Sequence, residues 1–289
     1  MKQLSLLEQA RTLEPGRSDV EHIERIAATT ISELEERAPV DLRVVASYRG
    51  INQIEVVPMP MSGCLAPEDG GIRMLLNSRD SVRRRRFTGF HEVGHSFQPG
   101  YRTRRQYRCN SSIRPSSDSD PEALSDAAAA ALLLPEAEFA PEVRESAFGL
   151  SSVIGLADRY EASVQATAYR FQRYWPEPTL MIVLEQGLRR EERGDPGAVP
   201  KLRVVSTRPV GSWPFVPRNK SASEAGRLVR AENGEIIDEI ASLDELGIDH
   251  PIKVRVSARA FTYRTGDGLS RRKVLAMYRQ LGTKRRHRR

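Results

Sequence analysis

The stretch Arg86-Phe-Thr-Gly-Phe-His-Glu-Val-Gly-His-Ser-Phe97 contains the pattern H-E-x-x-H. Residues four apart lie one above the other on one face of a helix, so His91 and His95 can hold a single metal ion. Glu92 follows the first histidine and can reach a water molecule on that metal. Because Zn2+ lowers the pKa of such a water towards ~7, we expect Glu92 to act as the general base. The spacing therefore predicts a helix over residues 87–98 that carries a hydrolytic zinc site.

A surface helix with two ordinary histidines is the alternative explanation for so short a pattern. The chain has five histidines, and two of them stand at this spacing. Phe87, Phe90 and Phe97 give the helix an apolar side that can bury the site. Gly94 costs about 1 kcal/mol relative to alanine in a helix, which indicates that another backbone comes close at this position.

A third ligand is needed, because catalytic zinc usually has three protein ligands and one open position. The downstream candidates are Cys109, Asp118, Asp120 and Glu122. Glu122 is best placed, since it falls in the first turn of a helix predicted over residues 121–134, with Asp120 as a possible N-cap. Asp126, one turn further on, can accept the free N–H of a zinc-bound imidazole. An acid stabilised by the helix dipole is the alternative role for Glu122.

Two roles within the polar segment of residues 99–120 stay open. An oxyanion stabiliser is required, and Tyr101, Tyr107 and several arginines are candidates. If Cys109 is a ligand, the zinc site contains a cysteine. Alternatively, Cys109 is a redox-sensitive thiol among arginines. A bystander thiol is the simpler interpretation of Cys109.

The motif and its flanks resemble the ImmA/IrrE family of metallopeptidases, which shows a phenylalanine and a threonine shortly before H-E-x-G-H. Downstream, Glu122-Ala-Leu-Ser-Asp-Ala127 and Ala131-Leu-Leu-Leu-Pro135 are similar to the family's E-x-x-A-N/D and F-A-x-x-L-L-M-P segments. Ser125 and Ala128 depart from the usual alanine and phenylalanine, which indicates a locally different core. Upstream, the similar segments are Pro39-Val-Asp-Leu42, Gly50-Ile51 and Gly71-Ile72.

This resemblance implies a gluzincin-type zinc metalloendopeptidase, with Zn2+ held by His91, His95 and Glu122 and with Mn2+ able to replace it in vitro. The better-understood members cut helix-turn-helix repressors. The resemblance therefore implies an XRE-type repressor as substrate, and release of a stress-response or mobile-element regulon as the outcome.

The predicted architecture is α+β. We expect a minimal zincin-like metallopeptidase domain of helices and a small antiparallel sheet over residues 1–148, followed by a helix-turn-helix-like segment at 149–176. An α/β sensor-like domain, GAF-like by the resemblance, is expected at 177–281, before a basic tail at 282–289. Besides the two helices above, the pattern predicts helices at 19–38 and 42–49 and two within 150–174, and strands at 53–57, 63–66, 71–76, 180–184, 202–206 and 252–256.

Composition restricts the partners and the cellular location that we expect for the protein. The 289 residues carry a net charge of +7, with arginine clusters that suit an acidic partner or DNA, or form a solvated face. Two cysteines make no disulfide framework. No apolar run of about 18 residues and no signal-peptide core are found, so we expect no membrane contact and a cytoplasmic protein.

Two other classes of function remain alternatives. The first is a DNA-binding transcription regulator with a structural zinc site, in which a helix bearing Gln165, Thr167, Arg170 and Arg173 enters a major groove. Simple packing of that helix is the competing interpretation. The second is a ligand-sensing scaffold built around the C-terminal region, without proteolysis.

Overall fold

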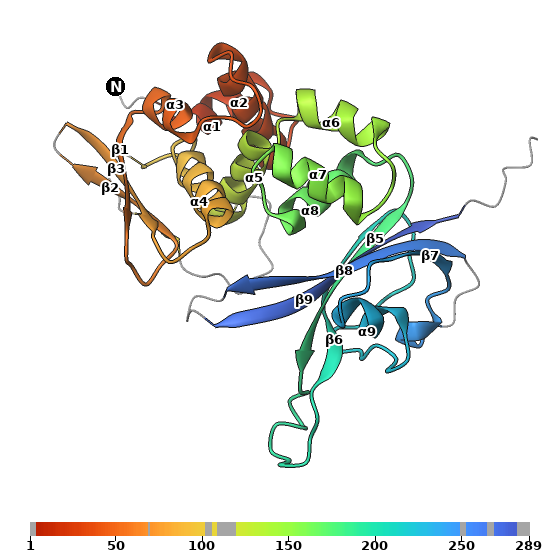
Figure 1. The fold of residues 1–289 in the computed structure, drawn as a ribbon. Helices are drawn as coiled ribbons and strands as arrows, with labels where there is room; N and C mark the ends of the chain where they lie inside the picture. The colour runs from red at the N-terminus through yellow and green to blue at the C-terminus, as the bar shows by residue number, and fades with distance from the viewer. Residues whose placement is uncertain are drawn as a thin grey trace, which may run out of the picture. The chain divides into compact units, whose positions relative to one another are not determined.

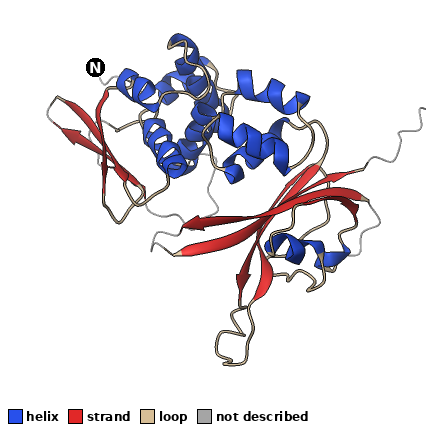
Figure 2. Cartoon of the chain, in the orientation of Figure 1, coloured by secondary structure: helices blue, strands red, loops and turns tan. Residues whose placement is uncertain are grey.

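A computed structural model describes residues 4–68, 70–101, 106–108, 120–248, 253–264 and 269–281 (Figure 1). The chain divides into two compact units. The first consists mainly of Met1–Glu142 and Leu156–Thr167, and the second mainly of Val143–Gly155, Ala168–Thr265 and Leu269–Arg289. Helices dominate the first unit and strands the second (Figure 2), which confirms the predicted α+β class.

The helices of the N-terminal half are α1 (Leu6–Leu13), α2 (Asp19–Glu33), α3 (Leu42–Tyr48), α4 (Val82–His95), α5 (Pro121–Leu133) and α6 (Glu136–Glu145). They are followed by α7 (Leu150–Arg159) and α8 (Val164–Tyr174). Local sequence explains several starts: Ser5 and Ser18 each form a capping box, and Asp120 caps α5 ahead of Pro121. Helices α1 and α6 were not predicted, and α2 ends at Glu33, well before Pro39.

The small sheet of the first unit has the order β1-β3-β2-β4. Its strands are β1 (Ile51–Val57), β2 (Gly63–Glu68), β3 (Gly71–Asn77) and β4 (Gln106–Arg108). β2 runs antiparallel to β3, as predicted, and also to β4, which was not predicted, whereas β1 runs parallel to β3. Val57, at the end of β1, pairs with Asn77, and Gly63, at the start of β2, pairs with Leu76, so both residues lie at the C-terminal end of β3. The short loop from Val57 to Gly63 therefore crosses over this end of β3, and β1 runs in the same direction as β3.

Helix α4 is the centre of the first unit, since it packs against α5, α3, β2 and β3. At Gly94 an added Cβ would lie 2.8 Å from Ala128 Cβ and 2.9 Å from Ser125 Cα. The predicted close approach of another backbone at Gly94 is therefore confirmed, and that backbone belongs to α5. Small residues on both helices allow the two faces that carry the site to approach each other closely.

We expect Gly94→Ala to destabilise the fold by about 1–3 kcal/mol, because overpacking against α5 backbone atoms outweighs the better helix propensity of alanine. Urea denaturation gives the free energy of unfolding. Gly155→Ala is the matched control, because Gly155 lies inside α7 with no atom within 4 Å of an added Cβ. That change should stabilise by up to about 1 kcal/mol. Equal effects of the two substitutions would contradict a steric role for Gly94.

The second unit is built on an antiparallel sheet of order β6-β5-β9-β8-β7. The strands are β5 (Thr179–Gly187), β6 (Lys201–Val210), β7 (Ile237–Ala241), β8 (Val254–Arg264) and β9 (Ser270–Gln280). The short helix α9 (Arg227–Glu232) buries Leu228 and Ala231 against residues such as Ile182, Val256 and Tyr278. Strands β7 and β9 and helix α9 were not predicted.

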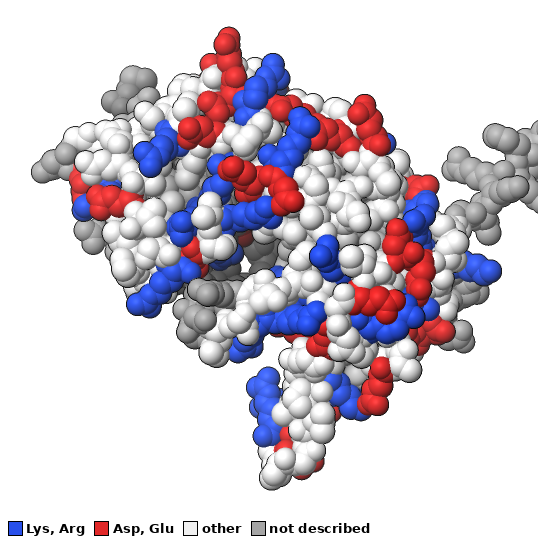
Figure 3. All heavy atoms as spheres, viewed as in Figure 1, with Lys and Arg blue, Asp and Glu red and all other residues white. Residues whose placement is uncertain are grey.

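Arginines of the cluster at residues 83–86 contact other groups of the first unit. Arg83 pairs with Asp158, and Arg86 pairs with Glu161 at 3.4 Å. On the face drawn in Figure 3, basic and acidic side chains are interspersed. The other predicted basic clusters, within residues 102–108 and at 284–289, lie outside the residues whose side chains are described.

The face of α8 considered for DNA reading is partly inside the protein. Thr167 is fully buried and Arg170 is 6% exposed, which favours the packing interpretation of this helix. None of the helices within the described ranges is long and apolar enough to cross a membrane.

Candidate metal centre

Two consecutive turns of α4 and the first turn of α5 supply the donor atoms of the site. The rings of His91 and His95 lie with their centroids 4.8 Å apart. Glu122 reaches both: its Oε2 is 3.3 Å from His91 Nε2 and its Oε1 is 3.4 Å from His95 Nε2. One donor atom from each of the three residues lies within 4.8 Å of the others. The structure thus brings together the three residues that the sequence proposed as ligands.

The other nitrogen of each imidazole is held by α5. Asp126 Oδ1 lies 2.8 Å from His91 Nδ1, and Ser125 Oγ lies 3.0 Å from His95 Nδ1. Gln98 Nε2 donates to the same Ser125 Oγ at 2.8 Å. These contacts favour the tautomer with a proton on each Nδ1, which leaves the Nε2 lone pairs directed at Glu122.

This donor set fits a catalytic zinc ion. Two imidazole nitrogens and one carboxylate oxygen form one of the known three-ligand sets of hydrolytic zinc. The histidine side chains are 1% and 2% exposed, whereas the Glu122 side chain is 54% exposed. The centre is therefore enclosed by α4 and open to solvent beside Glu122, as a site that receives a substrate must be.

Glu92 is fully buried on the same turn of α4. Strand β2 passes close to it, because a Cβ at Gly63 would lie 2.8 Å from Glu92 Oε1 and 2.4 Å from Thr88 Cγ2. A side chain at position 63 would therefore push against the carboxylate. Glycine at this position leaves the space that Glu92 occupies.

Sequence reasoning did not assign Ser125, Gln98 or Gly63 to the site. Ser125 was noticed only as a departure from alanine, although it precedes Asp126 and stands three residues after Glu122. Residues three apart are neighbours on a helix surface, so this spacing could have indicated that Ser125 faces α4 beside Glu122. Gly63 gave no such signal, because its role depends on how β2 packs on α4.

The remaining candidates are placed as follows. Asp120 accepts a hydrogen bond from the backbone N–H of Glu122 at 3.1 Å, so it caps α5. Tyr101 is buried, at 9% exposure. Cys109, Asp118 and the side chain of Tyr107 lie outside the described residues.

We expect Asp126→Asn to lower zinc affinity by about 10–100-fold, because the carboxylate that orients His91 and raises its basicity is lost. Competition with a chromophoric chelator measures this affinity. Asp158→Asn is the control, since Asp158 lies on the surface of α7 and, among the side chains that the structure describes, its carboxylate pairs only with exposed Arg83. Unchanged affinity in Asp126→Asn would show that Asp126 does not support the metal centre.

Comparison with known proteins shows which domain the segment around the site resembles. A solved structure, a Mycobacterium tuberculosis transcriptional regulator, is similar with a TM-score of 0.58 and 11% identity, over 90% of this chain and 76% of that one. At this identity the likeness concerns the fold. The curated proteins gave no match. Residues 62–172, which include the histidine pair, Glu92 and Glu122, match the IrrE N-terminal-like domain. Residues 62–172 are therefore similar to the IrrE N-terminal-like domain of a metallopeptidase family.

Proposed function

We propose that this protein is a site-specific zinc metalloendopeptidase. The observation that carries the proposal is that Glu122 faces the Nε2 atoms of His91 and His95 at 3.3 and 3.4 Å, with Glu92 buried on the same turn. A merely structural zinc site is usually closed by four protein ligands. Among the described residues, the cluster of possible ligands contains three.

Each residue of the site has a separate role in amide hydrolysis. Zinc, when bound by His91, His95 and Glu122, supplies a Lewis acid and lowers the pKa of water. The Glu92 carboxylate accepts the proton of the attacking water and later donates it to the amine nitrogen of the leaving segment. Asp126 and Ser125 keep the imidazoles in the orientation and tautomer that this reaction needs. Burial of Glu92 keeps bulk water away from the proton that it holds.

The proposed substrate is a helix-turn-helix repressor of the XRE type, whose cleavage derepresses a stress-response or mobile-element regulon. The support is the IrrE N-terminal-like domain together with the sequence resemblance described above. A cytoplasmic location and direct contact with DNA through basic residues belong to the same proposal.

The test is to mix the full chain, loaded with Zn2+ or Mn2+, with purified helix-turn-helix repressors of the XRE type from the same genome, beginning with any that a neighbouring gene encodes. We expect two fragments of the repressor from a single cut, identified by mass spectrometry. An intact repressor beside a fully metal-loaded protein would contradict the proposal. Tight operator binding without cleavage would instead favour the alternative of a DNA-binding regulator with a structural zinc site.

A further inference from the structure

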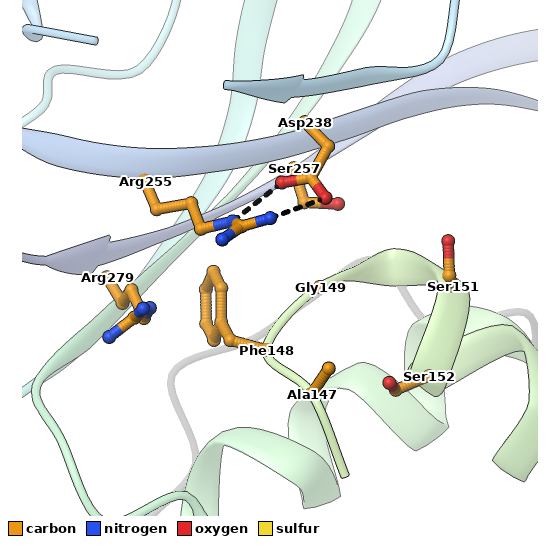
Figure 4. A pocket seen from close by; sticks show the side chains of 9 residues that line it. All are labelled: Ala147, Phe148, Gly149, Ser151, Ser152, Asp238, Arg255, Ser257 and Arg279. Atoms are coloured by element: carbon orange, nitrogen blue, oxygen red, sulfur yellow. Dashed lines mark hydrogen bonds and ion pairs between the residues drawn. The ribbon is translucent and has the colours of Figure 1, made fainter. Parts of the chain in front are cut away.

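A cavity of about 300 Å³ lies within the second unit, where the start of α7 meets β7, β8 and β9 (Figure 4). Its volume is at the lower end of the range of roughly 300–1,000 Å³ that small-molecule sites occupy. The metal centre does not use any of its residues. Its lining combines guanidinium groups, hydroxyl groups and one aromatic ring, which together indicate a chemical class of ligand.

The sheet contributes the charged side of the cavity. Arg255 pairs with Asp238 through two hydrogen bonds of 2.8 and 2.9 Å. Arg279 donates through Nη1 to Glu177 at 2.7 Å, while its Nε atom is buried without a hydrogen-bond partner in the described part of the chain. A buried donor without a partner is costly, so this nitrogen favours an acceptor from a ligand. Both arginines that line the cavity are paired with carboxylates, Arg255 with Asp238 and Arg279 with Glu177, so Arg279 Nε is a donor that remains for a ligand.

The start of α7 contributes further donors. Ser257, 5% exposed, accepts a hydrogen bond from the N–H of Leu150 at 2.9 Å, and within the described ranges its own hydroxyl hydrogen has no acceptor and can be donated to a ligand. Gly149 precedes the helix with a φ of +142° and has no side chain to cap it. The first-turn N–H groups of Ser151 and Ser152 therefore have no side-chain cap from that position, and the helix dipole adds positive potential there.

Phe148 contributes the apolar side. The Arg279 guanidinium lies 5.7 Å from the centre of its ring, and Trp175 supports the ring at a centroid distance of 5.4 Å. Figure 4 shows the ring beside the arginine side chains rather than turned away from them. An apolar ligand body can thus contact Phe148 while its charged end reaches the guanidinium groups.

We propose that this cavity binds a small organic monocarboxylate. The carboxylate accepts hydrogen bonds from Arg279 and Ser257, and the apolar body rests on Phe148. The unpartnered Arg279 Nε donor and the positive end of the α7 dipole favour an acceptor that carries a single negative charge. A phosphate dianion would bring two negative charges close to Asp238, where both neighbouring guanidinium groups are already paired with carboxylates, and this is unfavourable in a partly enclosed site.

The test is calorimetric titration of the full chain with benzoate and hexanoate, with benzamide as the neutral counterpart of benzoate and inorganic phosphate as the other anion. We expect the carboxylates to bind and benzamide and phosphate not to. Arg279→Gln should weaken carboxylate binding at least tenfold, since hydrogen bonds to charged groups contribute about 1.5–3 kcal/mol. Quenching of tryptophan fluorescence should accompany binding, because Trp175 lies behind Phe148.

Arg259→Gln is the matched control, because Arg259 is an exposed arginine of β8 outside the cavity, and it should bind like the wild type. Circular dichroism establishes that each variant is folded. Lack of binding by both carboxylates, equal binding of benzamide, preferential binding of phosphate, or an Arg279→Gln variant with unchanged affinity would each overturn the proposal. Because binding is measured without a peptide substrate, its failure is distinguishable from failure of the protease proposal.

Discussion

Replacing Glu92 by glutamine is expected to lower the rate of repressor cleavage by about 10²–10⁴-fold, because glutamine cannot accept the proton of the attacking water. The substitution is nearly isosteric, and Glu92 is fully buried beside Gly63 and Thr88, so the packing of α4 should persist. Zinc content should also persist, because Glu92 is not among the proposed ligands. The measurement pairs the single-turnover cleavage rate with the zinc stoichiometry of the same sample.

Two outcomes would contradict this role for Glu92. Wild-type cleavage by Glu92→Gln would mean that another group accepts the proton. Loss of zinc together with activity would mean that Glu92 belongs to the metal-binding set. A cleavage rate reduced at full zinc content supports a general base as distinct from a ligand.

Removing the third ligand, Glu122, should weaken metal binding about as strongly as Glu92→Gln slows cleavage. We expect Glu122→Ala to lower zinc affinity by more than about 100-fold, because even residues that only orient ligands contribute about 10–100-fold. Zinc should then no longer raise the melting temperature, whereas for the wild type a zinc concentration 100 times the Kd adds about 2.7 kcal/mol to stability. Mass-spectrometric metal analysis and thermal unfolding with and without zinc measure both effects.

Glu136→Ala provides the comparison for Glu122→Ala. Glu136 is also an exposed acid in the first turn of a helix, α6, but lies outside the donor cluster. It reproduces the loss of an acid at a helix N-terminus without the loss of a ligand. Equal zinc binding by the two variants would support the dipole interpretation of Glu122 and would remove the basis of the protease proposal.

The arrangement of the metal centre could largely be anticipated because its signals are local. His91 and His95 are related by the helical repeat alone, and Asp120-Pro121 marks the start of α5 two residues before Glu122. Gly94, which is unfavourable in a helix unless something lies close, indicated that another backbone approaches α4, and the structure identifies that backbone as α5. In contrast, the contact between Gly63 and Glu92 depends on the position of β2, which no spacing in the sequence encodes.

The second unit was harder to predict because its strands have weak or interrupted patterns. Strand β9 begins with Ser270-Arg-Arg-Lys273, which resembles a polar loop, and only its central residues are buried. It becomes a strand because it pairs with β5 and β8 along its length. Strand β7 has five residues and helix α9 has six, both too short for a periodic signal. In this unit pairing and burial, more than propensity, determine the structure.

The tight crossing of α4 and α5 at Gly94 has a consequence for ion selectivity. The two histidines belong to one helix and Glu122 to the other, so the space available to a cation depends on the separation of the two backbones. That separation is small, because the backbones at Gly94 and Ser125 leave no room for even a Cβ between them. Ions with short bonds to nitrogen and oxygen, such as Zn2+ at about 2.0–2.2 Å, suit this spacing. Calcium requires roughly 2.3–2.6 Å and six to eight oxygen ligands, and it should be discriminated against by ionic radius as well as by ligand type.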